Sequence, residues 1–207
     1  MVTRTIRALP QADAARDTPG GAGHKPLRLF FGIFPPPEVA QALTAAAQAA
    51  HPLCGGRITR PENLHITLAF LGRASAAQAT ELAALTRAIA APAGEVVIDR
   101  YGSFRRAQVV WAGPDPDSEG AHQLRDMSDE LWLRLRDLGW PGPDVWPLRP
   151  HVTLLHKADK RDTGELAFAP VTWRHQGYAL VASEPAPGGS RYRVLARTGI
   201  ARRGPYA

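Results

Sequence analysis

The sequence predicts an α+β protein whose sheets are antiparallel. Its candidate elements follow the order strand, helix, strand, helix, strand, strand, helix, strand, strand, strand. Strands that follow one another without a helix are typical of hairpins, whereas a parallel doubly wound sheet would alternate strands and helices throughout. The 207 residues, of which 44% are hydrophobic and 21% charged, are enough for a substantial core and typical of a globular chain.

The chain divides into a predicted flexible leader, one domain and a short tail. Residues 1–26 contain Pro19-Gly20-Gly21 and lack a periodic apolar face, which predicts a flexible leader. We expect a single domain over 27–200, followed by a basic tail over 201–207. The leader also lacks the apolar core of about 7–15 residues that a secretory signal needs.

The first half of the domain is expected to contain two strands, each followed by a helix. Residues 27–34 are a short apolar run typical of a buried strand, and the prolines after it suit the first turn of a helix over 38–50. The segment 57–72 contains NLHITLAFLG and is interpreted as a strand. Ser75 is a suitable N-cap for a helix over 75–91.

The second half is expected to be richer in strands. An amphipathic helix over 121–138 is predicted by leucine and methionine residues at spacings of three and four. A proline-rich loop follows it over 139–150. Strands are expected over 95–104, 107–113, 151–157, 171–183 and 190–198, the last two as a closing hairpin.

The net charge of +6 is concentrated at the two ends of the chain. Residues 27–190 carry 16 basic and 17 acidic side chains, whereas residues 191–207 carry five arginines and no acid. A basic strand and tail suit a polyanionic partner such as RNA. The alternative is a bias in composition, since 22 of the 25 basic residues are arginines.

Composition also excludes several classes of protein. No window approaches the roughly 18–20 consecutive apolar residues of a membrane span, which excludes an integral membrane protein. The single cysteine, Cys54, cannot form an intrachain disulfide or a cysteine-based metal centre. A single cysteine fits a reducing cytoplasm, so we expect a cytoplasmic protein. We also expect a monomer that uses no cofactor and no metal.

One short pattern occurs twice. The sequence His-Ile-Thr-Leu begins at His65, and His-Val-Thr-Leu begins at His151. In a strand, the histidine and the threonine of each motif share one face, while the apolar residues point to the core. A single His-x-Thr is most often structural, but two in matched contexts favour a paired site. If the two halves form similar lobes, the motifs face each other across a groove.

Two histidines and two hydroxyls suit the cleavage of a cyclic phosphodiester. An attacking water must lose a proton and a leaving alkoxide must gain one, and histidine can do either near neutral pH. The hydroxyls of Thr67 and Thr153 can donate to the non-bridging phosphate oxygens. No acidic cluster lies near either motif, which favours a mechanism without a metal ion.

The sequence resembles the RNA 2′,3′-cyclic phosphodiesterases, also called 2′-5′ RNA ligases, of the two-histidine (2H) phosphoesterase superfamily. The resemblance rests on the paired H-x-T-x motifs, NLHITLAFLG, the opening RLFFGIF, a central VVW and a late PHVTLL. It covers the chain from about residue 27 to residue 195. It implies a bilobal α+β fold, in which two related antiparallel sheets, flanked by helices, surround a central cleft.

The resemblance also implies a reaction and a role for each motif residue. Members of the family hydrolyse a 2′,3′-cyclic phosphate at an RNA end to a 2′-phosphomonoester, and tRNA fragments are among the expected partners. His65 would protonate the departing 3′ oxygen, and His151 would accept a proton from water. Thr67 and Thr153 would hold phosphate oxygens. The reverse reaction would join RNA ends through a 2′-5′ bond.

One position departs from the family pattern. Relatives often carry an arginine five residues after the second motif's histidine, where this chain has His156. His156, Lys157 and Arg149 are therefore three alternatives for a further phosphate ligand. Phe70 and Phe31 are candidates for stacking on a nucleobase, with core packing as the alternative for both.

Two other functions stay open on the sequence alone. The nearly neutral body favours a small cyclic nucleotide or an ADP-ribose cyclic phosphate as substrate of the same site, whereas the arginine-rich end favours RNA. A non-catalytic RNA-binding module would use only the basic ends, and the two complete His-x-Thr pairs argue against it. Turnover of a cyclic RNA end compared with a cyclic mononucleotide separates the two substrates.

Overall fold

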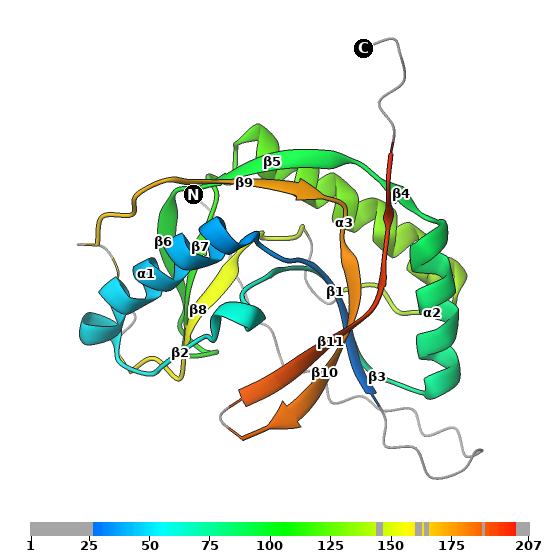
Figure 1. Cartoon of the computed structure of the whole chain (residues 1–207), viewed down its shortest axis with the longest axis horizontal. Helices are drawn as coiled ribbons and strands as arrows, with labels where there is room; N and C mark the ends of the chain where they lie inside the picture. Colours follow the sequence, from blue (N-terminus) through cyan, green and yellow to red (C-terminus); the bar gives the residue numbers. More distant parts are fainter. Residues whose placement is uncertain (1–26, 144–146, 160–162, 164–165, 188, 202–207) are drawn as a thin grey trace, which may run out of the picture.

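The computed structural model describes residues 27–143, 147–159, 163, 166–187 and 189–201. The predicted leader at 1–26 and the predicted tail, apart from Ala201, lie outside the described residues. The described chain has an α+β fold with an antiparallel main sheet, which confirms the predicted fold class (Figure 1).

The main sheet contains eight strands in the order β11-β10-β1-β3-β8-β7-β6, and the short β2 pairs with the end of β8. Its strands are β1 (Leu27–Ile33), β2 (Arg57–Ile58), β3 (Ile66–Ala74), β6 (Arg100–Phe104), β7 (Val109–Gly113), β8 (Val152–His156), β10 (Ala179–Ala186) and β11 (Gly189–Arg197). Two smaller pairs are β5 (Ala93–Ile98) with β9 (Val171–Gln176), and β4 (Ala90–Ala91) with β12 (Gly199–Ile200).

One residue pair joins the two halves of the main sheet. Ile66 of β3 lies opposite Val152 of β8, and β3 and β8 share no other pair in the described register. The strands on either side pair along most of their length. The sheet therefore divides at this seam into β11-β10-β1-β3 and β8-β7-β6, which is the bilobal arrangement that the family resemblance implied.

In the described residues, three α-helices pack on the sheets, together with a short 3-10 turn, η1 (Pro61–Asn63). The helix α1 (Pro37–Cys54) contacts β8 and β9, α2 (Ala76–Ala88) contacts β10 and β11, and α3 (Glu119–Asp137) contacts β3 and β5. Ser75 caps α2 as predicted, because its Oγ accepts from the Gln78 backbone N–H at 3.2 Å and the Gln78 side chain accepts from the Ser75 N–H. In the described part of the chain, no helix has the length and apolar character needed to cross a membrane.

Several predicted boundaries are wrong. The strand expected over 95–104 breaks at Asp99, so that β5 pairs with β9 while β6 pairs with β7. The strand expected over 171–183 is interrupted at Gly177, which has a φ of 77° and separates β9 from β10. The helix expected over 75–91 ends at Ala88, because Ala90 and Ala91 pair with β12. The helix expected over 38–50 continues to Cys54.

Candidate active site

The seam between β3 and β8 places both His-x-Thr motifs on one face of the sheet. Ile66 and Val152 are fully buried, so the side chains directly before and after each of them point to the opposite face. Because the strands are antiparallel, His65 lies on the same side of the pair as Thr153, and Thr67 on the same side as His151. The predicted grouping of two histidines and two hydroxyls therefore forms at the join of the two lobes.

Both histidines are held in the same tautomer by the same local contact. Nδ1 of His65 donates to the Asn63 carbonyl at 2.7 Å, and Nδ1 of His151 donates to the Arg149 carbonyl at 2.8 Å. A carbonyl oxygen can only accept, so Nδ1 carries the hydrogen in both rings. Nε2 of each ring is then the atom that accepts or gives a proton.

Three aromatic rings enclose His65. Its ring centroid lies 4.7 Å from that of Phe30, 5.7 Å from that of Phe34 and 5.3 Å from that of Tyr192. Burial lowers the pKa of His65 from 6.5 to about 4, and the charges of His151 and His156 add to this effect. His65 is therefore neutral at pH 7 before an anion binds.

His151 has a matching aromatic setting with a cation beside it. Its ring lies 4.8 Å from Phe104, edge to face, and 6.2 Å from Trp111. The guanidinium of Arg149 lies over Trp111 at 4.5 Å and over Phe104 at 5.7 Å. Burial lowers the pKa of His151, and the positive charge of Arg149 lowers it further. His151 is thus suited to start a reaction as a neutral base.

The three alternatives for a further phosphate ligand lie in different places. Arg149 is next to His151, as described above. His156 ends β8 opposite Arg57 of β2, and its pKa is lowered by burial and by the charge of Arg57. Since the charge of His156 also affects His65, His156 lies within electrostatic range of the site. Lys157 is exposed, with a φ of 54°, and no described contact links it to either motif.

The two stacking candidates differ in their exposure. Phe70 pairs with Phe30 across β1 and β3, is 50% exposed and lies under the guanidinium of Arg28 at 5.6 Å. It therefore shares the face of His65, although no described contact joins the two rings. Phe31 is fully buried against Tyr178, so the core-packing alternative holds for it.

The aromatic rings around both histidines were not predicted from the sequence. Phe30 and Gly32 of β1 and Phe34 directly after the strand follow a period of two, which the sequence RLFFGIF contains. The pattern does not tell which face meets the histidine. Trp111 contributes because it pairs with Thr153, and Tyr192 because β11 folds back near β1. Both depend on contacts between segments that are distant in sequence.

The chemistry available here is proton transfer and hydrogen bonding. Among the described residues, no group of three or more His, Cys, Asp or Glu side chains is arranged to hold a metal ion. Two imidazoles with free Nε2 atoms can exchange protons on either side of a reacting centre, and two hydroxyls can stabilise developing negative charge.

Comparison with known proteins gives consistent similarities. Residues 33–111, which include the first motif, match the family model "LigT like Phosphoesterase". The chain is 33% identical over 178 residues to RNA 2′,3′-cyclic phosphodiesterase of Escherichia coli (strain K12), which covers 84% of this chain and 96% of that protein. It is 32% identical to the protein of the same name from Thermus thermophilus, over 82% of this chain and 88% of the relative.

Solved structures agree with these sequence relationships. The crystal structure of E. coli LigT complexed with 3′-AMP superposes with a TM-score of 0.71 at 30% identity, covering 86% of this chain and all of that one. TT0787 of T. thermophilus superposes with a TM-score of 0.58 at 31% identity, covering 81% of this chain and 94% of that one. The similarity thus spans both halves of the sheet and both motifs.

Proposed function

This chain belongs to the LigT-like phosphoesterase family, the family of the RNA 2′,3′-cyclic phosphodiesterases, and we propose that it hydrolyses a 2′,3′-cyclic phosphate at an RNA end to a 2′-phosphomonoester. The observation that carries the proposal is the seam, which brings both His-x-Thr motifs to one sheet face. A solved relative in complex with 3′-AMP supports a nucleotide as ligand.

The proposed reaction is an in-line displacement at phosphorus. A water oxygen forms a bond to phosphorus while its proton passes to Nε2 of His151, and the bond from phosphorus to the ribose 3′ oxygen breaks as Nε2 of His65 gives that oxygen a proton. Thr67 and Thr153 donate hydrogen bonds to the non-bridging oxygens. Arg149 is the charged group beside His151 and is proposed as the further phosphate ligand, in preference to His156 and Lys157.

The low pKa of His65 fits this scheme once substrate is bound. A cyclic phosphate carries one negative charge, and a negative charge next to an imidazole raises its pKa. In this proposal His65 gains its proton when substrate binds, while burial, with the charge of Arg149 added to it, keeps the pKa of His151 low. The two neutral histidines of the free protein thus become an acid–base pair in the complex.

The proposal is tested with an oligonucleotide that ends in a 2′,3′-cyclic phosphate, incubated with chelator, followed by identification of the product isomer. We expect a 2′-phosphate product in the presence of chelator. His65→Ala and His151→Ala should each lose about 100- to 10,000-fold in turnover, the range for a positioned general acid or base. His122→Ala is the matched control, because His122 is exposed on α3.

Loss of activity with chelator and its return with a divalent ion would overturn the mechanism, as would a 3′-phosphate product. Full activity in either alanine variant would remove the two-histidine assignment. The monomeric state, the cytoplasmic location, tRNA fragments as substrates and the reverse 2′-5′ ligation stay predictions, each open to direct measurement.

A further inference from the structure

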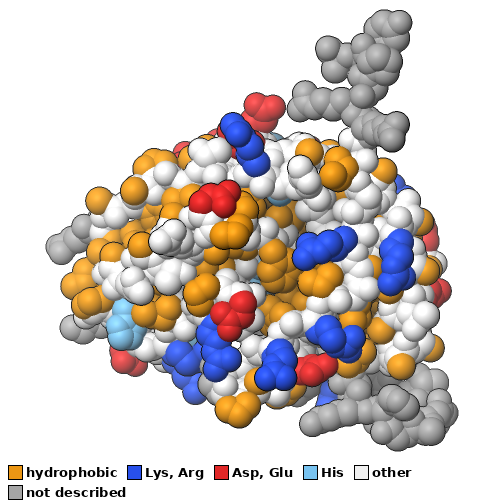
Figure 2. Space-filling view, in the orientation of Figure 1, with side chains coloured by type: hydrophobic (Ala, Val, Ile, Leu, Met, Phe, Trp, Pro, Cys, Tyr) orange, Lys and Arg blue, Asp and Glu red, His pale blue; other side chains and the backbone are white. Residues whose placement is uncertain are grey.

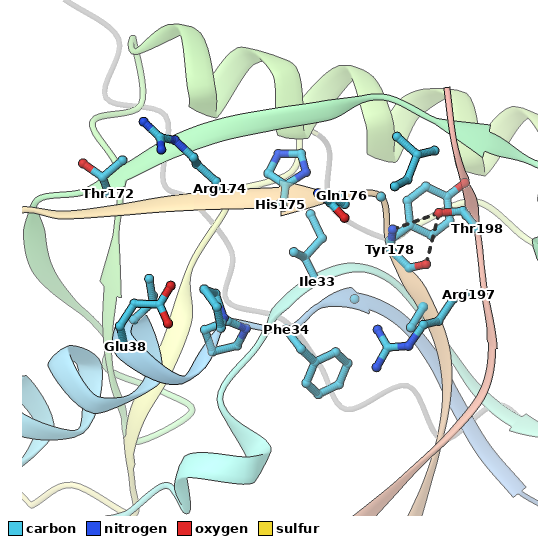
Figure 3. A pocket seen from close by; sticks show the side chains of 17 residues that line it. Ile33, Phe34, Glu38, Thr172, Arg174, His175, Gln176, Tyr178, Arg197 and Thr198 are labelled. Atoms are coloured by element: carbon cyan, nitrogen blue, oxygen red, sulfur yellow. Dashed lines mark hydrogen bonds between the residues drawn. The ribbon is translucent and has the colours of Figure 1, made fainter. Parts of the chain in front are cut away.

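A large cavity borders the site on the β1 side. Its volume is about 930 Å³, within the range of pockets that bind small molecules. It lies between the start of α1, the strand β9 and the last residues of β11, and Figure 3 shows Glu38, Arg174 and Arg197 around it. In the space-filling view, the middle of the molecule is hollowed, and both basic and acidic side chains lie around the hollow (Figure 2).

The cavity and the histidine site share a wall. Gly32 and Phe34 both line the cavity. The Phe34 ring stacks on His65 at 5.7 Å with an interplanar angle of 25°, and a Cβ atom on Gly32 would come 3.4 Å from the His65 ring. A ligand in the cavity would therefore lie next to the ring that stacks on His65.

The register of the sheet connects the motif to an arginine on the far side of this cavity. Thr67 pairs with Gly32, Gly32 with Ala179, and Ala179 with Arg197. Paired residues on neighbouring strands share a face, so Arg197 is on the face of Thr67. Three strand spacings place their backbones about 14 Å apart. Arg197 lines the cavity, and Figure 3 shows its side chain there.

Arg197 is the cation at this cavity that is available to a ligand. In the described part of the chain, its guanidinium makes no hydrogen bond or ion pair, whereas Arg174, the other arginine of the lining, is paired with Glu95 at 2.8 Å. His175, also in the lining, has a pKa lowered by burial and is neutral at pH 7. Glu38 lies across the cavity, where it can accept from the N–H or O–H groups of a base or ribose.

Resting on the proposed function, we propose that this cavity binds the nucleotide directly 5′ of the one that carries the cyclic phosphate. The chain of a cyclic-phosphate RNA leaves the reacting ribose through a 5′ phosphodiester, whose negative charge a cation one nucleotide away from the histidines would bind. Arg197 supplies that cation, and Phe34 offers a ring face for the base. A cyclic mononucleotide would leave the cavity unused.

The test compares kcat/KM for a dinucleotide that ends in a 2′,3′-cyclic phosphate with kcat/KM for a 2′,3′-cyclic mononucleotide. We expect the wild-type protein to prefer the dinucleotide. In Arg197→Gln the ratio of the two kcat/KM values should fall about ten- to a hundredfold, as for a lost hydrogen bond to a charged group. Gln176→Trp, which fills the cavity from β9 without changing its charge, should lower the ratio in the same direction.

Arg193→Gln is the matched control. Arg193 is an exposed arginine of the same strand, lies outside the cavity and is ion-paired with Glu184 at 3.7 Å, so its loss should leave the ratio unchanged. An unchanged ratio in Arg197→Gln, or an equal fall in Arg193→Gln, would overturn the assignment of the cavity. Absence of turnover on both substrates would instead refute the proposed function, so the two failures are distinguishable.

Discussion

Removing the ring of Tyr192 should raise the pKa of His65. Burial is the largest cause of the shift from 6.5 to about 4, and three rings provide the enclosure. If Tyr192 accounts for about a third of this pKa shift, Tyr192→Ala raises the pKa of His65 by roughly one unit. The protonated fraction of His65 near neutral pH then rises about tenfold. Tyr192→Phe is the matched variant, because it keeps the ring and removes only the hydroxyl.

Two measurements check this expectation. An NMR titration of the free protein follows the His65 imidazole directly, and the pH dependence of kcat/KM reports the groups of the free enzyme. In Tyr192→Ala, the alkaline limb assigned to His65 should move up by the same amount as the NMR pKa, while Tyr192→Phe stays near the wild type. A pKa of about 4 in Tyr192→Ala, or an equal rise in Tyr192→Phe, would refute aromatic burial as the cause.

Two further outcomes follow from the geometry of the site. In Gly32→Ala, the new methyl group would come 2.9 Å from the Ile66 carbonyl oxygen and 3.4 Å from the His65 ring. We therefore expect a misplaced imidazole and about ten- to a hundredfold lower turnover. Gly142→Ala is the control, because its methyl group meets nothing within 4 Å, and equal turnover in the two variants would contradict the reasoning. The pKa of His65 is lower in the folded than in the unfolded chain, so the free energy of unfolding should fall as pH drops from about 6.5 towards 4 and stay level above 6.5. The fall should be smaller in His65→Gln. Denaturant titrations across this pH range measure the free energy of unfolding, and a flat profile in the wild-type protein would contradict the expectation.

Sequence reasoning predicted the parts of this site that depend on local pattern. The period of two in each His-x-Thr motif places histidine and threonine on one face, and this follows from strand geometry alone. The N-cap at Ser75 and the amphipathic pattern of α3 are equally local, and both are found in the structure. These features depend on residues within a few positions of one another.

The errors lie where strand pairing between distant segments decides the structure. Nothing near Asp99 in the sequence tells that β5 leaves the main sheet to pair with β9. The glycine at position 177 suggests a turn, but the new strand after it forms only because β10 pairs with β1. The rings around the histidines were missed for the same reason, since Trp111 and Tyr192 reach the site only through the pairing of their strands.

The two halves of the site are nearly symmetric, and one difference between them supports the proposed roles. Each histidine donates from Nδ1 to the carbonyl of the residue two positions earlier, which is Asn63 in the first motif and Arg149 in the second. The same backbone contact therefore puts an uncharged side chain beside His65 and a cation beside His151. Burial is the larger cause of the lowered pKa of His151, and this cation adds to it, which fits the proposed role of His151 as acceptor of the water proton. No arginine is among the causes that lower the pKa of His65, which are burial and the charges of His151 and His156, and the negative charge of a bound phosphate opposes those causes.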